Sequence, residues 1–185
     1  NNPRKEELLK SGFSKGLVAL LIHYSSPEFY DADLCGLVLK CMANFSLIPK
    51  GVDILMADGV IPAFRNFFAE YKEKLPSHMK LMMATISNLS YEPRPEVLDR
   101  ILADKGVELI LDTLGHFAHK NDPDTTEVCI DALTHVAASP KTLDYLTKTN
   151  VVDVLVDFLR QQMNDRLVYK DLRCFTRLVE NEKLA

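Results

Sequence analysis

The sequence predicts an all-α protein built as a solenoid of about four repeated units. Three observations lead to this prediction. A segment returns at an interval of about 47 residues, the apolar residues follow purely helical spacing, and the 185-residue chain is 47% hydrophobic, enough for a substantial core. Units of this length typically stack, because neighbouring units bury a core that none could bury alone.

The repeat is visible in two similar segments, ILMADG ending at Gly59 and ILADKG ending at Gly106, which stand 47 residues apart. The same register reaches back to Gly12 and forward to Asn150. The first and eighth residues after these four positions are always apolar: Phe13, Val60, Val107 and Val151, then Leu20, Phe67, Leu114 and Phe158. We therefore expect a single domain with repeats at about 1–47, 48–93, 94–138 and 139–185. The chain opens on NNPRKEE without an initiator Met, and we interpret it as a piece of a longer protein.

Each repeat contains the pattern of three helices. The first is short and is expected at 5–10, 52–57, 96–103 and 142–148, each time followed by a left-handed turn at Gly12, Gly59, Gly106 or Asn150. The second carries an apolar face, as in Val154, Leu155, Phe158 and Leu159. The third is the longest and is expected at 33–47, 77–90, 125–138 and 167–180, after helix starts at Asp31, Pro76, Asp122 to Asp124, and Asn164 with Asp165.

Aligning the third helices separates a buried stripe from a polar one. The buried stripe contains columns such as Leu39, Met83, Ile130 and Leu172. Lys170 and Asp171 interrupt apolar columns, which indicates either a terminal unit with a more polar outer surface or a local shift of the alignment. The polar stripe recurs every fourth residue and should face solvent or a ligand. Its expected binding residues are Lys40, Asn44, Lys80, Asn88, Glu127, Asp131, His135, Arg173 and Arg177, and the same columns also contain Gly36, Ala84 and Tyr169.

Three motifs make the chain resemble the armadillo-repeat family: MANFS at Met42–Ser46, SNLS at Ser87–Ser90, and GVIPAF at Gly59–Phe64. The resemblance implies a right-handed α-solenoid of three-helix armadillo repeats. It also implies that the third helices line a concave groove, where Asn44 and Asn88 would hold the backbone of an extended partner. His135 and Arg177 depart from the family's asparagine. The chain has no Trp, so it lacks the groove tryptophans of the family's nuclear-import adaptors.

The polar stripe suggests the chemistry of the partner. Lys40 and Lys80 make the first half basic, and Glu127 and Asp131 make the third repeat acidic. Lys170, Arg173 and Arg177 make the fourth basic, and the alternation favours a protein or peptide of mixed charge. A structural alternative stays open at this point. Asp131 could pair with Arg173, and the two asparagines could only satisfy neighbouring backbone groups.

Composition argues against other partner classes. The net charge is −4, without a basic run or a glycine-rich phosphate loop, so nucleic acid is not expected. No apolar stretch approaches the roughly 20 residues of a membrane span. Cys35, Cys41, Cys129 and Cys174 lack zinc-site spacing, which favours reduced thiols in the cytoplasm.

The sequence contains no catalytic motif, and we expect no enzyme activity, cofactor or metal. His116 and His119, with Asp122 and Asp124 after them, are formally compatible with a metal site, but histidines in such a polar loop usually face solvent. The expected function is a non-enzymatic adaptor or scaffold that binds an extended partner segment. The alternative is a structural component of a cytoskeletal or multi-subunit assembly that docks by its convex face or its ends, with possible end-to-end self-association.

Overall fold

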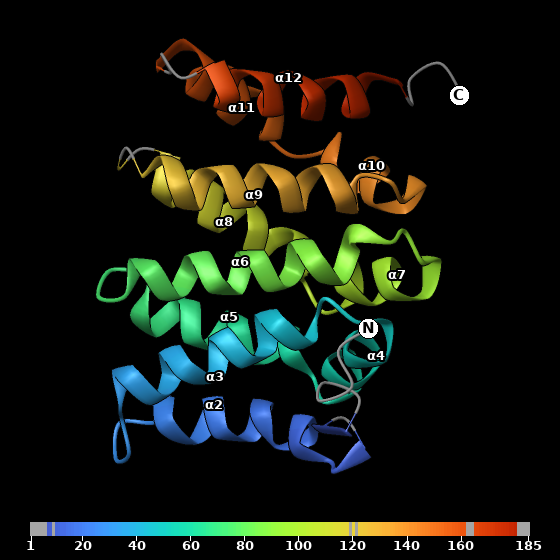
Figure 1. The fold of residues 1–185 in the computed structure, drawn as a ribbon. Helices are drawn as coiled ribbons and strands as arrows, with labels where there is room; N and C mark the ends of the chain where they lie inside the picture. Colours follow the sequence, from blue (N-terminus) through green and yellow to red (C-terminus); the bar gives the residue numbers. More distant parts are fainter. Residues whose placement is uncertain (1–6, 9, 119, 121, 162–164, 181–185) are drawn as a thin grey trace. The chain divides into compact units, whose positions relative to one another are not determined.

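The computed structural model describes residues 7, 8, 10–118, 120, 122–161 and 165–180 (Figure 1). Over these residues the chain forms eleven α-helices and one short 3-10 helix, with no β-strand. The all-α prediction is therefore confirmed. Of the expected first helix at 5–10, residues 7, 8 and 10 are described and are helical, and the other three lie outside the described residues.

The chain divides into two compact units, Asn1–Leu89 and Ser90–Ala185. The first unit contains η1 (Phe13–Gly16), α2 (Leu17–Ser25), α3 (Ala32–Phe45), α4 (Pro49–Ala57), α5 (Val60–Tyr71) and nearly all of α6 (Pro76–Tyr91). Within this unit α2 lies beside α3 and also packs against α5 (Figure 1). Two second helices of successive repeats therefore contact each other.

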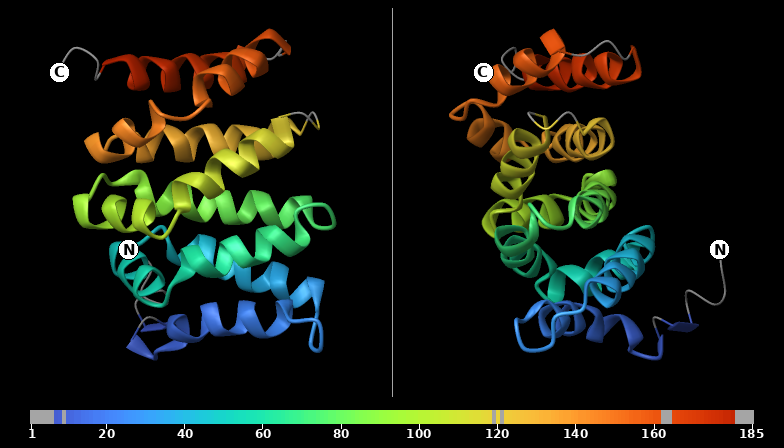
Figure 2. Two further views of the ribbon diagram at one scale, coloured as in Figure 1. Left: turned by 180° about the vertical axis from the view of Figure 1, so that it is seen from behind. Right: turned by 90° about the vertical axis from the view of Figure 1, so that its left-hand side faces the viewer.

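The second unit contains α7 (Pro95–Ala103), α8 (Gly106–Ala118), α9 (Pro123–Val136), α10 (Pro140–Leu146), α11 (Val151–Gln161) and α12 (Asp165–Glu180). Equivalent helices of its two repeats pack on one another: α7 on α10, α8 on α11, and α9 on α12. In the same unit the second and third helices of each repeat also lie side by side, α8 with α9 and α11 with α12 (Figure 2). This like-on-like packing is what a helical repeat requires.

Hydrogen bonds between repeats follow the same period in the first unit. The Tyr71 hydroxyl donates to the Ser25 carbonyl at 2.5 Å, and His78 Nε2 lies 2.8 Å from the Ala32 carbonyl oxygen. Both pairs are 46 residues apart, which is one repeat length. The repeat in the sequence is thus a repeat in space within this unit.

Helix starts agree with the residues expected to cap them. Asp31 accepts a hydrogen bond from the Leu34 amide at 2.9 Å, and Asp122 accepts one from the Thr125 amide at 3.1 Å. These carboxylates satisfy amides that have no partner within the helix. Proline begins α4, α7 and α10, so these helices start one to three residues earlier than expected.

The left-handed turns are confirmed in two repeats and wrong in the other two. Gly12 and Gly59 have φ angles of 77° and 79°. In the third repeat the left-handed residue is Lys105, with φ 63°, and Gly106 begins α8 as a helical residue. Asn150 has no positive φ, and the Thr149 hydroxyl beside it donates to the Leu146 carbonyl at 2.7 Å and accepts from the Val151 amide.

Lys105→Gly should stabilise the second unit by up to about 1 kcal/mol, because glycine adopts a left-handed conformation without the steric cost of a side chain. Urea denaturation followed by circular dichroism measures this. Lys105→Ala is the control and should leave stability nearly unchanged. A Lys105→Gly variant no more stable than Lys105→Ala would show that the turn is unstrained.

A tight contact joins α3 to α4. A Cβ atom placed on Gly51 would lie 2.0 Å from the Phe45 carbonyl oxygen and 3.1 Å from Ile48 Cγ1. Gly51 therefore lets the start of α4 pass directly over the end of α3. The corresponding residues of α7 and α10 are Val97 and Thr142, so this approach is specific to the second repeat.

The predicted core of the third helices is confirmed except in the last one, and on α11 Leu155 and Phe158 are buried whereas Val154 and Leu159 are only half-buried. The core columns of α3, α6 and α9 are buried throughout, but Leu172 is 52% exposed and Asp171 is 0% exposed. The buried face of α12 is formed by Leu167, Asp171, Cys174 and Leu178. The expected alignment therefore fails in α12, and Asp171 lies in the interior of the unit instead of on a polar outer surface.

Among the described residues, no helix is both long enough and apolar enough to cross a bilayer.

Candidate functional site

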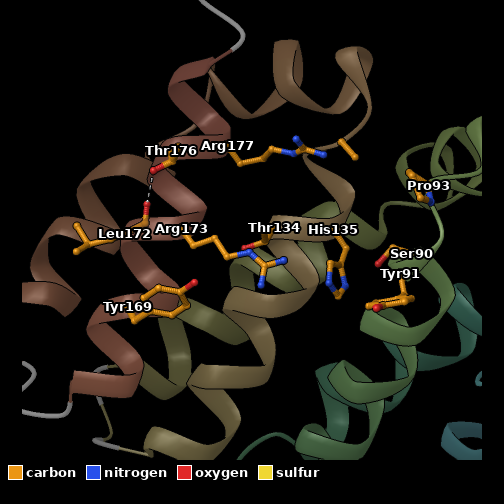
Figure 3. A pocket seen from close by; sticks show the side chains of 11 residues that line it. Ser90, Tyr91, Pro93, Thr134, His135, Tyr169, Leu172, Arg173, Thr176 and Arg177 are labelled. Atoms are coloured by element: carbon orange, nitrogen blue, oxygen red, sulfur yellow. Dashed lines mark hydrogen bonds between the residues drawn. The ribbon is translucent and has the colours of Figure 1, made fainter.

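An open groove of about 810 Å³ lies in the second unit, between the third helices α9 and α12 and the end of α6 (Figure 3). Its lining combines aromatic and apolar side chains with basic and hydroxyl groups, and it contains no acidic residue. The lining residues are Ser90, Tyr91, Pro93, Thr134, His135, Ala138, Tyr169, Leu172, Arg173, Thr176 and Arg177.

The α12 side of the groove is a ladder of three side chains at intervals of four residues: Tyr169, Arg173 and Arg177. Residues at this spacing lie on one face of a helix, about 6 Å apart along its axis. All three are exposed, because α12 buries its opposite face against α9 and α11. Figure 3 shows both arginine side chains extending from α12 toward α9.

The opposite side of the groove comes from α9 and the last residues of α6. His135 lies edge-on to the Tyr91 ring, with ring centroids 5.3 Å apart and an interplanar angle of 87°. The Thr134 hydroxyl donates to the Ile130 carbonyl of its own helix at 2.7 Å. Tyr91 is 71% exposed, so one face of a large ring is available in the groove.

The acidic residues expected in the binding stripe form ion pairs with basic residues of α12. Glu127 lies 2.7 Å from both Arg166 and Lys170, and Asp131 also pairs with Lys170. Burial acts to lower the pKa of the Lys170 ammonium, but its hydrogen bonds to Asp131 and Glu127 outweigh burial and raise that pKa. Lys170 therefore stays charged and neutralises this acidic pair.

Arg173 and Arg177, by contrast, form no ion pair with any residue in the described part of the chain. The alternative in which Asp131 pairs with Arg173 is thus wrong, because Asp131 forms its ion pair with Lys170. The guanidinium groups retain their five donors each for a ligand.

The first-unit residues of the polar stripe are placed differently. Asn44 is exposed and its Nδ2 donates to the Lys40 carbonyl of the same helix at 2.9 Å. Asn88 Nδ2 lies 3.2 Å from the Ala43 carbonyl and 3.0 Å from the Ser46 hydroxyl. Asn88 thus joins α6 to the end of α3, as the structural alternative expects.

The two lysines of this unit complete the stripe. Lys40 is exposed and Lys80 is half-buried. Their predicted contact with a partner remains a prediction, as does that of Asn44 and Asn88.

Most of the cysteine thiols lie in the interior of the protein. All four cysteines are free; Cys35, Cys129 and Cys174 are buried and Cys41 is half-buried. Burial raises the pKa of the Cys129 thiol, and burial is also the main cause that raises the pKa of Cys174 to about 12. A thiol that stays protonated is a poor nucleophile.

The formal metal site gains no support from the part of the chain that the structure describes. His119 lies outside it, and no cluster of three or more potential ligand residues occurs within it.

Sequence reasoning placed His135, Arg173 and Arg177 in the binding stripe, and the structure brings these three together. It missed Tyr91, Thr134 and Thr176, and it assigned Leu172 to the core. Tyr169 was placed in the same stripe as the arginines but was not counted among the expected binding residues. The sequence pattern gave no signal for Tyr91, because this residue lies beyond the last aligned column of α6.

No protein-family model and no curated protein matches the chain. Similar folds occur among engineered proteins whose crystal structures were determined by the Northeast Structural Genomics Consortium. One has a TM-score of 0.82 and 13% sequence identity, with 97% of this chain and 69% of that chain covered.

Two further engineered proteins have TM-scores of 0.79 and 0.78, each at 16% identity. They match 95% and 96% of this chain, which in turn spans 66% and 40% of their lengths. At these identities the likeness concerns the fold alone, and it supports an all-helical repeat fold for this chain.

Proposed function

We propose that the chain is an armadillo-type solenoid segment that serves as a non-enzymatic protein-binding module in the cytoplasm. Three-helix repeats that pack like on like, with left-handed glycines at Gly12 and Gly59, support the repeat type. Free cysteines, three of them buried, agree with a reducing compartment.

The observation that carries the binding function is the composition of the second-unit groove. Tyr91 and Tyr169 are 71% and 68% exposed. Leu172 lies beside two arginines that form no ion pair among the described residues. Tyr and Arg are enriched at protein interfaces because they combine a large contact surface with directed hydrogen bonds. An open groove with exposed rings suits a peptide segment better than a small molecule, which is usually enclosed.

A groove-filling variant tests this function. Thr176 is exposed and lines the groove, so Thr176→Trp should occupy the space without disturbing the core. Peptides selected from a random display library on the wild-type chain should bind the Thr176→Trp variant at least about tenfold more weakly. Val152→Trp, at a position on α11 that is also exposed but lies outside the groove lining, is the matched control. Equal binding by all three chains would contradict the proposed function.

A second candidate is supported by the outer face of α2. Leu20 and Ile22 are exposed there while Leu17, Val18 and Leu21 are buried, so the helix is apolar on nearly all sides. Helices of this kind are usually covered on both faces. This observation favours the structural alternative, in which an end of the repeat docks into an assembly. The two candidates differ in the residue that touches the partner, Thr176 or Ile22.

A further inference from the structure

The charges that remain available in the second-unit groove are all positive. Arg173 and Arg177 lie in its lining with no acidic residue beside them, and Glu127 and Asp131 are neutralised by Lys170 and Arg166. A partner of mixed charge would therefore find no available carboxylate in this groove. Charge complementarity instead favours a partner segment that carries carboxylates.

The spacing of the ladder adds a geometric condition. Tyr169, Arg173 and Arg177 follow one another at about 6 Å along the axis of α12. Every second residue of an extended chain advances by about 6.6 Å and projects to the same side. An extended segment that runs along α12 can therefore meet the three ladder residues with three alternate side chains.

The side chain expected at each position of the bound segment follows from the ladder residue that it would contact. Guanidinium groups bind carboxylates through two parallel hydrogen bonds, a geometry that a lysine cannot reproduce. The exposed Tyr169 ring and the neighbouring Leu172 offer an apolar contact at the end of the ladder. Tyr91 and His135 form the facing wall, which can cover the segment from the other side.

We infer that the second-unit groove takes an acidic extended segment of the pattern apolar-x-acidic-x-acidic, with one carboxylate on Arg173, one on Arg177 and the apolar side chain against Tyr169. This inference rests on the proposed function and specifies its partner. A nucleic acid strand also presents regularly spaced anions, but the net charge of −4 and the absence of a basic run favour the peptide.

The test uses short synthetic peptides that share one composition, in which the two glutamates are adjacent, two residues apart, or four residues apart. Fluorescence anisotropy at low and moderate salt should show that the two-residue spacing binds about tenfold more tightly than the others, with weaker binding at higher salt. A lysine version of the best peptide should not bind.

Charge-reversal variants test whether Arg173 and Arg177 bind the peptide carboxylates. Arg173→Glu with Arg177→Glu should lose at least about tenfold in affinity for the glutamate peptide and gain binding of the lysine peptide. Lys148→Glu with Arg160→Glu changes the net charge equally at exposed positions of the same unit outside the groove, and should bind as the wild type does. All variants should keep the wild-type melting temperature, since these side chains are exposed.

Two outcomes overturn the inference. One is that affinity does not depend on the spacing and charge of the peptide. The same conclusion follows if the Arg173→Glu, Arg177→Glu variant binds display-selected peptides as well as the wild type does. The other is that a single-stranded oligonucleotide binds more tightly than the acidic peptide and displaces it. In either case the proposed function survives if Thr176→Trp still blocks selected peptides, and it fails separately if Thr176→Trp has no effect.

Discussion

Replacing Gly51 with alanine should destabilise the first unit by about 3 kcal/mol or more. The added Cβ would lie 2.0 Å from the Phe45 carbonyl oxygen, a backbone atom that cannot move aside as a side-chain end can. Ile48, whose amide donates to the same carbonyl at 3.2 Å, holds the oxygen in place. The start of α4 must therefore shift away from α3. Chemical denaturation followed by circular dichroism measures the loss.

Gly115→Ala is the matched control for this experiment. Gly115 lies within α8, and a Cβ there would meet nothing within 4 Å. Alanine should stabilise that helix by about 0.5–1 kcal/mol, because glycine loses more backbone entropy on folding. A glycine-to-alanine substitution thus lowers the stability at position 51 and raises it at position 115. A Gly51→Ala variant that unfolds like the wild type would show that α4 does not approach α3 so closely.

The second large effect concerns the carboxyl group of Asp171. It is 0% exposed, and no described residue forms a hydrogen bond with either of its oxygens. Burial raises its pKa to about 7, from an ordinary value of 3.8. The folded state therefore favours the protonated carboxyl, and folding stability should fall as the pH rises from about 4 to 7, where ionisation of the buried group becomes necessary.

Asp171→Val removes this ionisable group at nearly the same side-chain volume. Relative to the wild type, the variant should gain about 4 kcal/mol in free energy of unfolding between pH 4 and pH 8, with most of the gain below pH 7. Urea denaturation at a series of pH values measures it. Asp157→Val, at an exposed position on α11, controls for the loss of one acidic residue and should show no such trend. A pH-independent difference for Asp171→Val would mean that the carboxyl is solvated.

The all-α fold and the repeat period could be predicted because they depend on local patterns. The spacing of apolar residues determines which helix face is buried, and Asp31 and Asp122 are caps whose action reaches only three residues along the chain. Gly51 shows the limit of such patterns. Its importance arises from contact with a carbonyl of the preceding helix, which no propensity of glycine reveals.

Lys105 shows a second limit. A left-handed residue costs a lysine only about 1 kcal/mol, so the turn can use Lys105 although Gly106 follows it. The alignment of repeats placed the turn on the glycine because it compared residue types, and residue type alone does not decide which residue reverses the chain.

The candidate site was predictable in part. The arginines and His135 follow from a four-residue stripe, which depends only on helix geometry. The pairing of Lys170 with Glu127 and Asp131 depends instead on how α12 rotates against α9. The same rotation buries Asp171 and exposes Leu172. A single-sequence alignment contains no information on this rotation, so it could not tell that the acidic residues are unavailable to a partner.

Site-specific photocrosslinking tests the central claim most directly. A benzophenone amino acid replaces either Tyr91, an aromatic residue of similar shape that lines the second-unit groove and is 71% exposed, or Ile22 on the outer face of α2, which is 55% exposed. The chain is then irradiated with cytoplasmic extract, and the crosslinked peptides are identified by mass spectrometry. If the groove is the binding site, position 91 will crosslink to an acidic segment of one protein and position 22 will not. Crosslinking from position 22 alone would contradict the groove and place the partner on α2.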